Sequence, residues 1–502
     1  MTGPHTSLTR RGLLGGLLAA GSTLAHPALG LTTSPYPAAR PAGLWRRNLA
    51  ELGTLVRQAR LGGETSLTVI DLETGQPLEG YASTTALPPA SVAKAATALY
   101  ALRVLGPSHR FATRLMADGP ISNGRLDGDL YLLGGGDPVL DTAALGALAA
   151  QLKTAGITEV TGHLRVVDSA LPTIRTIDPG QPDHLGYSPA ISGLNLNFNR
   201  VYFEWRRLGS EYAVTMDARA GDLRPQVRVS SMSVQPRDVP IYTYEQRGSE
   251  DHWTVARGAL GVEGGRWLPV RNPAGYAADV FQTLAGAQGL RLKLGPTSAS
   301  LPEGAQTLAE HLSPPLTDIA RGMLKYSTNL TAECLGLATS RSLGARPDSL
   351  VASGAQMSAW HRAQLPTSSE LGFVDHSGLG ARSRISSADM AMLLATHGSA
   401  PALAPHLKTY LTRDSQGKTL AVQPADVVAK TGTLNFVSGL SGYITPPAGR
   451  PLAFAIFSAD LDRRARLTRA ERERPDGGRA WARRARKLQN DLVLRWSRLA
   501  SS

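Results

Sequence analysis

The sequence predicts an α/β (α+β) fold: a sheet flanked by helices, interrupted by a large β-rich insertion. Helix and strand patterns alternate over residues 44–111, strand patterns dominate residues 112–310, and helices return from residue 311 before a final hairpin and strand. Because the two outer stretches share one pattern, we expect residues 44–111 and 311–502 to pack together as one discontinuous domain. At 502 residues the chain has room for the insertion to form one or two further domains.

The composition is that of an ordinary globular protein, with 42% hydrophobic and 19% charged residues. The net charge is +13, but residues 461–502 alone hold 13 Lys and Arg against five Asp and Glu. Most of the excess therefore lies in one terminal segment, and we expect no nucleic-acid partner. A solvated basic helix is the first interpretation of this segment, and a peripheral contact with anionic envelope polymers or lipid headgroups is the second.

The first 30 residues have the pattern of an export signal and are not expected to belong to the folded domains. Arg10 and Arg11 directly precede the apolar stretch 13–24, and residues 28–30 offer a small-x-small cleavage site. The paired arginines resemble a twin-arginine signal. Residues 31–43, which contain three prolines, are expected to be a linker. We therefore expect a protein of the periplasm or another extracytoplasmic part of the envelope.

The first part of the outer domain is predicted as a helix, a strand and a second helix. An apolar stripe predicts a helix over 44–61, and residues 66–71 have strand character. Pro89, followed by Ser91 and an alanine-rich run, predicts a helix that begins near Ser91. Lys94 lies three positions later, on the same face of that helix. A serine beside a lysine can become a nucleophile.

A second Ser-x-x-Lys pattern joins Ser415 to Lys418, but it contains Gly417 and is interpreted as a turn. The remaining elements are predicted as follows: strands at 128–133, 162–168, 201–205, 226–230, 239–244 and 452–458, helices at 140–154, 316–337, 387–397 and 478–499, and a hairpin of 426–430 with 439–444. The run Gly134-Gly135-Gly136-Asp137 lacks the Lys-Ser/Thr of a phosphate loop, so a structural turn is expected there.

Metal or cofactor chemistry has no support in the sequence. Cys334 is the single cysteine, which excludes an intramolecular disulfide and a two-cysteine metal site, and it is expected in the core. None of the 11 histidines forms His-Glu-x-x-His. His361, His376 and His397 are interpreted as surface or packing residues. We expect neither a metal nor a cofactor.

Two further motifs favour Ser91 over Ser415 as the nucleophile. Ser327-Thr328-Asn329 is the single Ser-x-Asn of the chain, and Lys430-Thr431-Gly432-Thr433 ends a predicted strand. Ser-x-x-Lys, Ser-x-Asn and Lys-Thr-Gly in this order resemble the motif set of penicillin-binding proteins and serine β-lactamases.

The spacing narrows the resemblance. Ser91 and Ser327 are 236 positions apart, whereas Ser327 and Lys430 are 103 apart, so the large insertion lies between the first two motifs. This placement, together with the segments 128–138, 192–197 and 375–379, resembles the low-molecular-mass class C penicillin-binding proteins, the S13 family of D-alanyl-D-alanine carboxypeptidases and endopeptidases. The resemblance spans residues 45–460. Two departures, His376 for a usual glycine and Thr328 for a frequent aspartate, are expected to affect substrate preference more than activity.

The resemblance implies the role of each group. Ser91 would be acylated by peptidoglycan stem peptides or by β-lactams, and a neutral Lys94 would take its proton. Lys430 would lower the pKa of Lys94 and attract the substrate carboxylate, aided by the hydroxyls of Thr431 and Thr433. Gly432 would keep the strand edge open for the substrate backbone.

Ser327 would pass a proton to the departing D-alanine, and Asn329 would orient Lys94 and the substrate amide. The backbone N–H groups of Ser91 and Thr433 would form the oxyanion hole. The balance between carboxypeptidase and endopeptidase activity stays open, as do the preferred third stem residue and the oligomeric state.

Two alternatives remain. A serine β-lactamase would need fast deacylation, yet no Glu-x-x-Leu-Asn occurs in the chain. A non-catalytic peptidoglycan-binding protein would keep the fold without turnover, yet all five polar catalytic groups are present.

Overall fold

The computed structural model describes residues 51–365, 371–396 and 398–500, so the predicted export signal and linker lie outside the described residues. A six-stranded antiparallel sheet with the order β18-β19-β20-β21-β1-β2 organises the outer part of the chain. Its strands are β1 Glu64–Asp71, β2 Pro77–Tyr81, β18 Lys408–Thr409, β19 Asp426–Leu434, β20 Val437–Thr445 and β21 Leu452–Ala459. Strand β1 pairs with β21 along its length, with Leu67 opposite Ile456, so the two ends of the described chain share one sheet.

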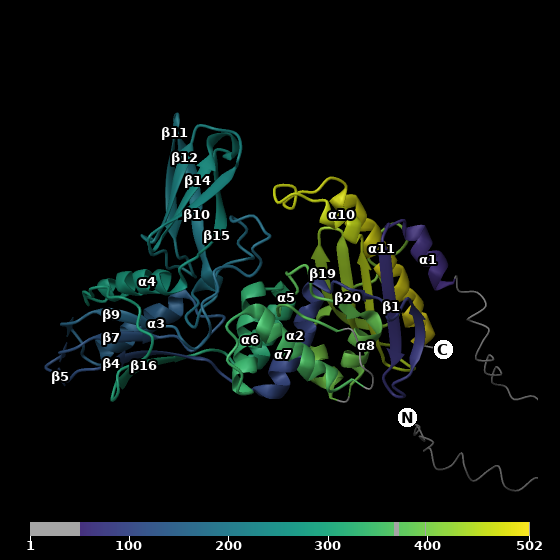
Figure 1. The fold of residues 1–502 in the computed structure, drawn as a ribbon, viewed down its shortest axis with the longest axis horizontal. Helices are drawn as coiled ribbons and strands as arrows, with labels where there is room; N and C mark the ends of the chain where they lie inside the picture. Colours follow the sequence, from purple (N-terminus) through teal and green to yellow (C-terminus); the bar gives the residue numbers. More distant parts are fainter. Residues whose placement is uncertain (1–50, 366–370, 397, 501–502) are drawn as a thin grey trace, which may run out of the picture. The chain divides into compact units, whose positions relative to one another are not determined.

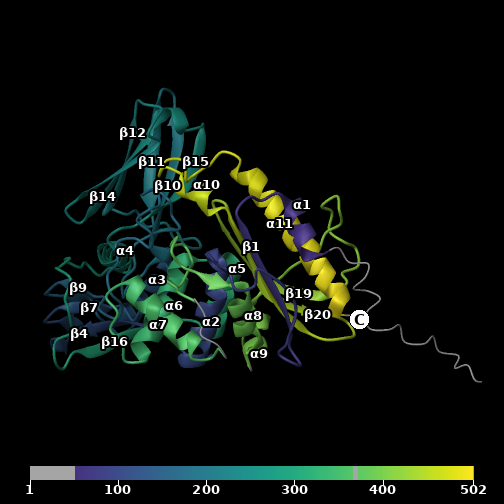
Figure 2. The same cartoon turned by 45° about the vertical axis from the view of Figure 1, so that its right-hand side comes forward.

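Helices cover both faces of this sheet (Figures 1 and 2). The helices of the outer part of the chain are α1 Leu52–Ala59, α2 Ala93–Val104, α5 Leu316–Tyr326, α6 Asn329–Ser342, α7 Leu350–Arg362, α8 Ser387–Ala395, α9 Ser399–Leu403, α10 Leu461–Ala465 and α11 Gly478–Ala500, of which α8 packs on one face of the sheet and α1 and α11 on the other. The alternation of β21 explains the two layers, because successive side chains of a strand point to opposite faces. Ala453, Ala455 and Phe457 pack in the cluster with α2 and α8, whereas Phe454 and Ile456 pack with α1 and α11.

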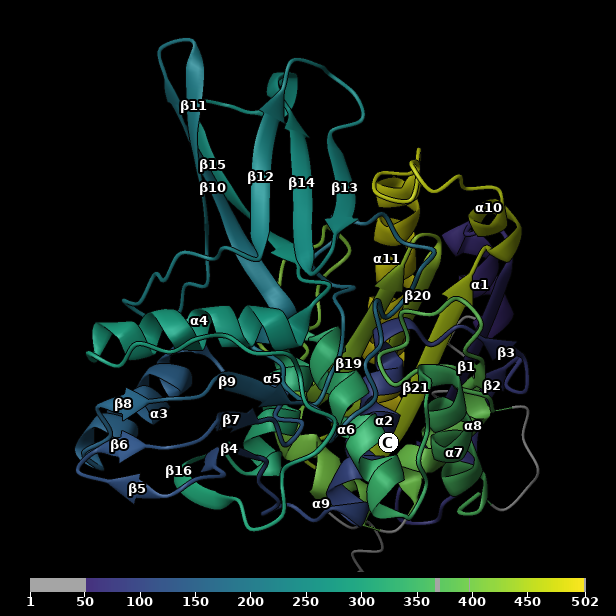
Figure 3. The ribbon, with the colours of Figure 1, turned by 60° about the vertical axis from the view of Figure 1, so that its left-hand side comes forward.

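The inserted residues form smaller sheets and two helices (Figure 3). One sheet has the order β16-β4-β7-β9, formed by β4 Ala112–Ala117, β7 Leu130–Leu133, β9 Leu164–Val167 and β16 Gln306–Leu312. Strand β4, the first of these in the chain, pairs with β16, the last, and Ala112 lies opposite Leu312. The chain therefore enters and leaves the insertion side by side.

Three further sheets belong to this stretch: β5-β6-β8 (Ile121–Ser122, Arg125–Leu126, Glu159–Val160), β11-β10-β15 (Glu211–Asp217, Arg200–Leu208, Glu263–Pro269) and β12-β14-β13 (Ser230–Gln235, Glu250–Ala256, Tyr242–Arg247). The helices are α3 Thr142–Thr154 and α4 Pro273–Ala287, and the short pair β3 Ala86–Leu87 with β17 Ile385–Ser386 lies outside the insertion. One cluster of buried apolar residues lies wholly within 115–309, so the inserted stretch has its own core.

Several sequence-based boundaries were wrong. The helix predicted over 316–337 is two helices that break at Ser327 and Thr328. The strand predicted at 226–230 begins only at Ser230, and the one at 239–244 begins at Tyr242. The prediction also missed α4, whose sequence is rich in alanine and glycine and carries no charge except Asp279. Among the described residues no helix is both long and apolar enough to cross a membrane.

Candidate active site

Ser91 lies where the sequence predicted, at the start of a helix. It is the middle residue of a single 3₁₀ turn, Ala90–Val92, that runs directly into α2. Ala90 has a positive φ of 47°, a conformation that side chains other than glycine rarely adopt and that recurs at functional sites. Lys94 follows on the first turn of α2 with no exposed surface, and its Nζ lies 3.0 Å from the Ser91 Oγ.

The Lys94 amine has three oxygen neighbours. Besides Ser91, its Nζ donates to the Asn329 Oδ1 at 2.7 Å and to the Ser377 carbonyl at 2.8 Å. A neutral amine has two N–H donors and one lone pair. With the two N–H groups directed at Asn329 and Ser377, the lone pair would face the Ser91 hydroxyl, which is the arrangement that a general base requires.

Ser327 lies at the break between α5 and α6. Its backbone is left-handed, with φ 59° and ψ 38°, which ends α5 and lets α6 begin two residues later at Asn329. The break explains why a continuous apolar pattern over 316–337 misled the helix prediction. The Ser327 Oγ accepts a hydrogen bond of 3.0 Å from the Lys430 Nζ. Asn329 uses its other end to donate to the Tyr187 carbonyl at 2.9 Å, a contact to the inserted stretch that the sequence did not indicate.

The Lys-Thr-Gly-Thr motif lies on β19. Lys430 is nearly buried, whereas Thr431 and Thr433 are exposed. Gly432 also makes a close approach that the sequence did not indicate. A Cβ on it would lie 2.6 Å from the Pro89 carbonyl oxygen and 3.0 Å from the Ser91 nitrogen, so glycine is needed for β19 to approach the nucleophile turn.

One edge of β19 is open beside this motif. Strand β18 pairs with β19 at Val428 and Ala429, and no strand of the described chain pairs with residues 430–434 on that side. Unpaired backbone groups at a strand edge can bind an extended peptide by strand addition.

Two buried carboxylates near Lys94 were missed by the sequence analysis. Glu333 has no exposed surface, and its two oxygens accept from the backbone N–H groups of His376 and Ser377, both at 2.9 Å. Asp375 accepts from Gly378 and Gly380. These contacts fix the segment that presents the Ser377 carbonyl to Lys94. A lone carboxylate within the apolar run of α6 was the signal that could have identified Glu333.

Burial sets the pKa of both lysines. It lowers the pKa of Lys94 to about 8, against the carboxylates of Glu333 and Asp375, which raise it. Burial also lowers the pKa of Lys430 to about 7, and the nearby Lys94 and Lys408 act in the same direction. Repulsion between the two lysines was expected to lower the pKa of Lys94, but it lowers the pKa of Lys430 instead. At Lys94, burial is the main cause of the lowered pKa.

Burial raises the pKa of Glu333, with a further contribution from Asp375. The two backbone N–H groups that donate hydrogen bonds to Glu333 favour its ionised form and oppose this rise in pKa.

The other singled-out residues are structural. His361 and His376 are buried, and burial lowers the pKa of His376 to about 3. The His376 ring contacts Ser353 and Met357, and a Cβ on Gly336 would collide with it. The presence of His376, where the family usually has a glycine, thus changes core packing rather than the cleft.

Cys334 is buried, as expected, and burial raises the pKa of its thiol well above the usual value. Ser415 and Lys418 belong to a tight turn closed by the Asp414 carboxylate, whereas His397 lies outside the described residues. Within the described ranges, no group of three or more His, Cys, Asp or Glu side chains is arranged to hold a metal ion.

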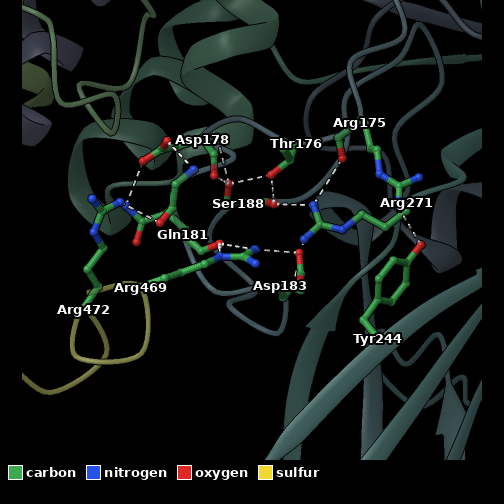
Figure 4. A network of polar contacts seen from close by, with 11 residues as sticks. Arg175, Thr176, Asp178, Gln181, Asp183, Ser188, Tyr244, Arg271, Arg469 and Arg472 are labelled. Atoms are coloured by element: carbon green, nitrogen blue, oxygen red, sulfur yellow. Dashed lines mark hydrogen bonds and ion pairs between the residues drawn. The ribbon is translucent and has the colours of Figure 1, made fainter. Parts of the chain in front are cut away.

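A cleft of about 690 Å³ lies beside Ser91. Ser91, Ser327, Asn329 and Thr433 line it from the outer part of the chain, and Gln181 and Tyr187 line it from the inserted stretch. Figure 4 shows how the segment 466–477 reaches the residues 178–183 beside this cleft: Arg469 and Arg472 donate to the carbonyls of Gln181 and Gly180. Such an arrangement can hold an extended substrate against a serine that has a buried amine within hydrogen-bond distance.

Comparisons with known proteins agree with this geometry. The chain is 28% identical over 488 residues to a D-alanyl-D-alanine carboxypeptidase of Actinomadura sp. (strain R39), covering 89% of this chain and 88% of that protein. It is 25% identical to the D-alanyl-D-alanine carboxypeptidase DacB of Haemophilus influenzae, covering 82% of this chain and 90% of that protein. The crystal structure of penicillin binding protein 4 (dacB) from Haemophilus influenzae has the same fold, with a TM-score of 0.72 at 22% identity, over 89% of this chain and 100% of that one.

The comparison with protein families covers most of the chain. The model of the D-Ala-D-Ala carboxypeptidase 3 (S13) family matches residues 48–477, a range that includes all three motifs. The predicted family resemblance and fold class are thereby confirmed, and the chain belongs to the D-Ala-D-Ala carboxypeptidase 3 (S13) family.

Proposed function

We propose that this chain hydrolyses the terminal peptide bond of D-alanyl-D-alanine stem peptides through an acyl-enzyme on Ser91. The observation that carries the proposal is the Lys94 amine, held 3.0 Å from the Ser91 Oγ with two other oxygen acceptors for its N–H groups. The names of its relatives support the substrate class.

Acylation would begin with transfer of the Ser91 proton to Lys94 while the Ser91 oxygen attacks the carbonyl carbon of the penultimate D-alanine. The N–H groups of Ser91 and Thr433 would stabilise the oxyanion, aided by the partial positive charge at the start of α2. The proton would then pass by way of Ser327 to the departing nitrogen as the C–N bond breaks. Water would finally hydrolyse the ester, and β-lactams would acylate Ser91 by the same route.

Substrate binding would set the proton positions. In the free protein burial lowers the pKa of both lysines. A substrate carboxylate at Lys430, Thr431 and Thr433 would favour the charged form of Lys430, because an opposite charge raises the pKa of an amine. The restored cation would in turn disfavour the proton on Lys94. The carboxylate of the substrate would thus help to neutralise the base that attacks its own peptide bond.

The test is the release of free D-alanine from a defined monomeric pentapeptide, with a cross-linked muropeptide dimer assayed in parallel by mass spectrometry. Release of D-alanine that Ser91→Ala abolishes supports the proposal. Rapid nitrocefin turnover without D-alanine release would favour the β-lactamase alternative, and stable penicillin labelling without hydrolysis of either muropeptide would favour a non-catalytic binding protein.

The finer aspects of location also stay proposals. Export by the twin-arginine-like segment would bring the protein to the peptidoglycan in the periplasm or an equivalent compartment. In the basic C-terminal segment, α11 packs an apolar face that includes Trp481, Leu488 and Trp496 on the sheet. Its other faces remain candidates for anionic envelope components.

Replacing Glu333 with glutamine should move the pH profile of acylation. The acylation rate is expected to rise as the pH increases through the Lys94 pKa of about 8, because only the neutral amine is a base. The Glu333 charge raises the pKa of Lys94, so its removal should shift this acid limb to lower pH. The measurement is penicillin labelling rate against pH, with Glu310→Gln on the surface as the control. A purely structural role would reduce the rate at every pH and leave the limb in place.

A further inference from the structure

Three arginines on α11 line the same cleft as the nucleophile. Arg479, Arg483 and Arg486 lie four and three positions apart, on one face of the helix, and all are exposed. None of the three side chains has a hydrogen bond or ion pair to any other described residue, whereas the side chain of their neighbour Arg484 donates to the Arg60 carbonyl. We call Arg479, Arg483 and Arg486 the arginine ridge.

The stability of α11 does not explain the ridge. Helix N-termini carry a partial positive charge and favour acidic side chains, yet the first turn of α11 has none and Arg479 lies in it. Like charges three and four positions apart repel each other on a helix surface. The arrangement therefore opposes helix formation unless an anion lies against it.

The ridge is held on a rigid support. The opposite face of α11 is buried through Trp481, Ala485 and Leu488, and the Trp481 indole donates to the Leu61 carbonyl at 2.6 Å. The segment that leads into α11 is tied to the far wall of the cleft, because Arg472 donates to the Gly180 carbonyl at 2.7 Å (Figure 4). The helix that carries the ridge is therefore fixed, and the planar fork of an arginine loses less freedom per hydrogen bond formed than a lysine amine does.

No acidic side chain among the described cleft residues is free to neutralise the ridge. Glu473 is the single carboxylate that lines this cleft, and it faces His184 at 3.1 Å and Arg266 at 3.6 Å. The cleft as described is therefore strongly positive at its α11 end.

The direction of β19 identifies which part of a substrate would reach the ridge. From Lys430, where the terminal carboxylate is proposed to bind, the strand runs on to Thr433 and Leu434, and these two residues and Ser91 line the cleft with all three ridge arginines, while Arg483 and Arg486 also line a neighbouring cavity with Thr431 and Gly432. A peptide laid along this edge would place its terminal D-alanine at Lys430 and its acyl side toward α11.

We infer that the arginine ridge binds a carboxylate of the peptide substrate on the acyl side of the scissile bond. The inference rests on the proposed function. Guanidinium groups match carboxylates in geometry, and three of them would select anionic over neutral peptides. The selectivity should weaken with added salt, since exposed charges are screened over about 10 Å at 0.1 M ionic strength.

The test uses two synthetic peptides that end in D-alanyl-D-alanine and differ in the N-terminal cap, a succinyl group or its uncharged amide. The unsubstituted protein should show a kcat/KM about five- to tenfold higher for the succinyl peptide at low salt. In the variant Arg479→Gln/Arg483→Gln/Arg486→Gln this ratio should fall to about one, with kcat/KM for the amide unchanged. The controls are Arg484→Gln on the same helix and the charge-matched Arg206→Gln/Arg224→Gln/Arg247→Gln, which should keep the ratio.

A ratio near one in the unsubstituted protein, or a ratio that survives in the ridge variant, would overturn the inference. An equal loss of kcat/KM for both peptides in the ridge variant would also overturn it. Loss of retention of the ridge variant on a heparin column, with an unchanged peptide ratio, would overturn it too and would assign the ridge to a polyanion. If neither peptide is hydrolysed and penicillin does not label Ser91, the proposed function itself fails. Calorimetry of both peptides with the Ser91→Ala protein then tests the ridge without turnover: tighter binding of the succinyl peptide supports it, and equal binding overturns it.

Discussion

Replacing Lys94 with methionine should slow acylation of Ser91 by penicillin about a thousandfold. A positioned general base contributes roughly 10²- to 10⁴-fold to such reactions, and Lys94 is the single side-chain base within hydrogen-bond reach of the Ser91 Oγ among the described residues. Methionine fills a similar volume without the amine, so the fully buried position should tolerate it. The measurement is the rate of labelling by a fluorescent penicillin, together with the melting temperature.

Lys418→Met is the matched control, because Lys418 ends the other Ser-x-x-Lys pattern and lies in an exposed turn. This variant should be labelled at the original rate. Labelling of the Lys94 variant within tenfold of that rate, with the fold intact, would contradict the role of Lys94.

The substitution Gly378→Ala should disable the site although Gly378 carries no functional group. Its φ is 73°, and a Cβ would lie 1.8 Å from the Ala90 carbonyl oxygen, beside the nucleophile. Relief of the collision must move either the Ser91 turn or the segment that presents the Ser377 carbonyl to Lys94. We expect a loss of about 2–4 kcal/mol in the free energy of unfolding and a fall in acylation rate of about a hundredfold or more.

Gly344→Ala separates the collision from the backbone strain. Gly344 also has a positive φ, 85°, but a Cβ on it would have no atom within 4 Å. Its substitution should cost about 1 kcal/mol and leave acylation unchanged. Equal effects of the two substitutions on acylation would show that the close approach to Ala90 does not matter.

The sequence predicted the groups that carry polar chemistry better than the groups that hold them. Ser91, Lys94, Ser327, Asn329 and Lys430 stand in short patterns. In the structure Ser91, Ser327 and Asn329 line one cleft, Lys94 donates hydrogen bonds to Ser91 and Asn329, and Lys430 donates one to Ser327. Their assignment as catalytic residues stays a prediction until it is tested by substitution.

The supporting groups come from distant parts of the chain. Glu333 acts through backbone N–H groups 43 and 44 positions away, and the Tyr187 carbonyl contacts Asn329 across 142 positions. No local periodicity encodes such contacts. The arginine ridge is visible in the sequence as a basic segment, but only the packing of α11 beside the sheet turns it toward the cleft.

The elements of the fold were also predicted where a local sequence pattern marks them and missed where none does. The strand β21 and the hairpin of β19 with β20 were predicted, and the structure contains both; β21 is buried along its whole length, as a short apolar run of strand-forming residues implies. The break at Ser327 was missed because a left-handed serine interrupts an apolar pattern without changing it. Helix α4 was missed because its small residues give little amphipathic contrast between its faces.

The most direct test of the account is to locate the bond that penicillin forms. The protein would be incubated with benzylpenicillin, digested, and analysed by mass spectrometry for the peptide that carries the adduct. We expect one adduct per chain, on Ser91, which Ser91→Ala abolishes and Ser415→Ala leaves intact. An adduct on any other residue, or one that persists in a folded Ser91→Ala variant, would contradict it.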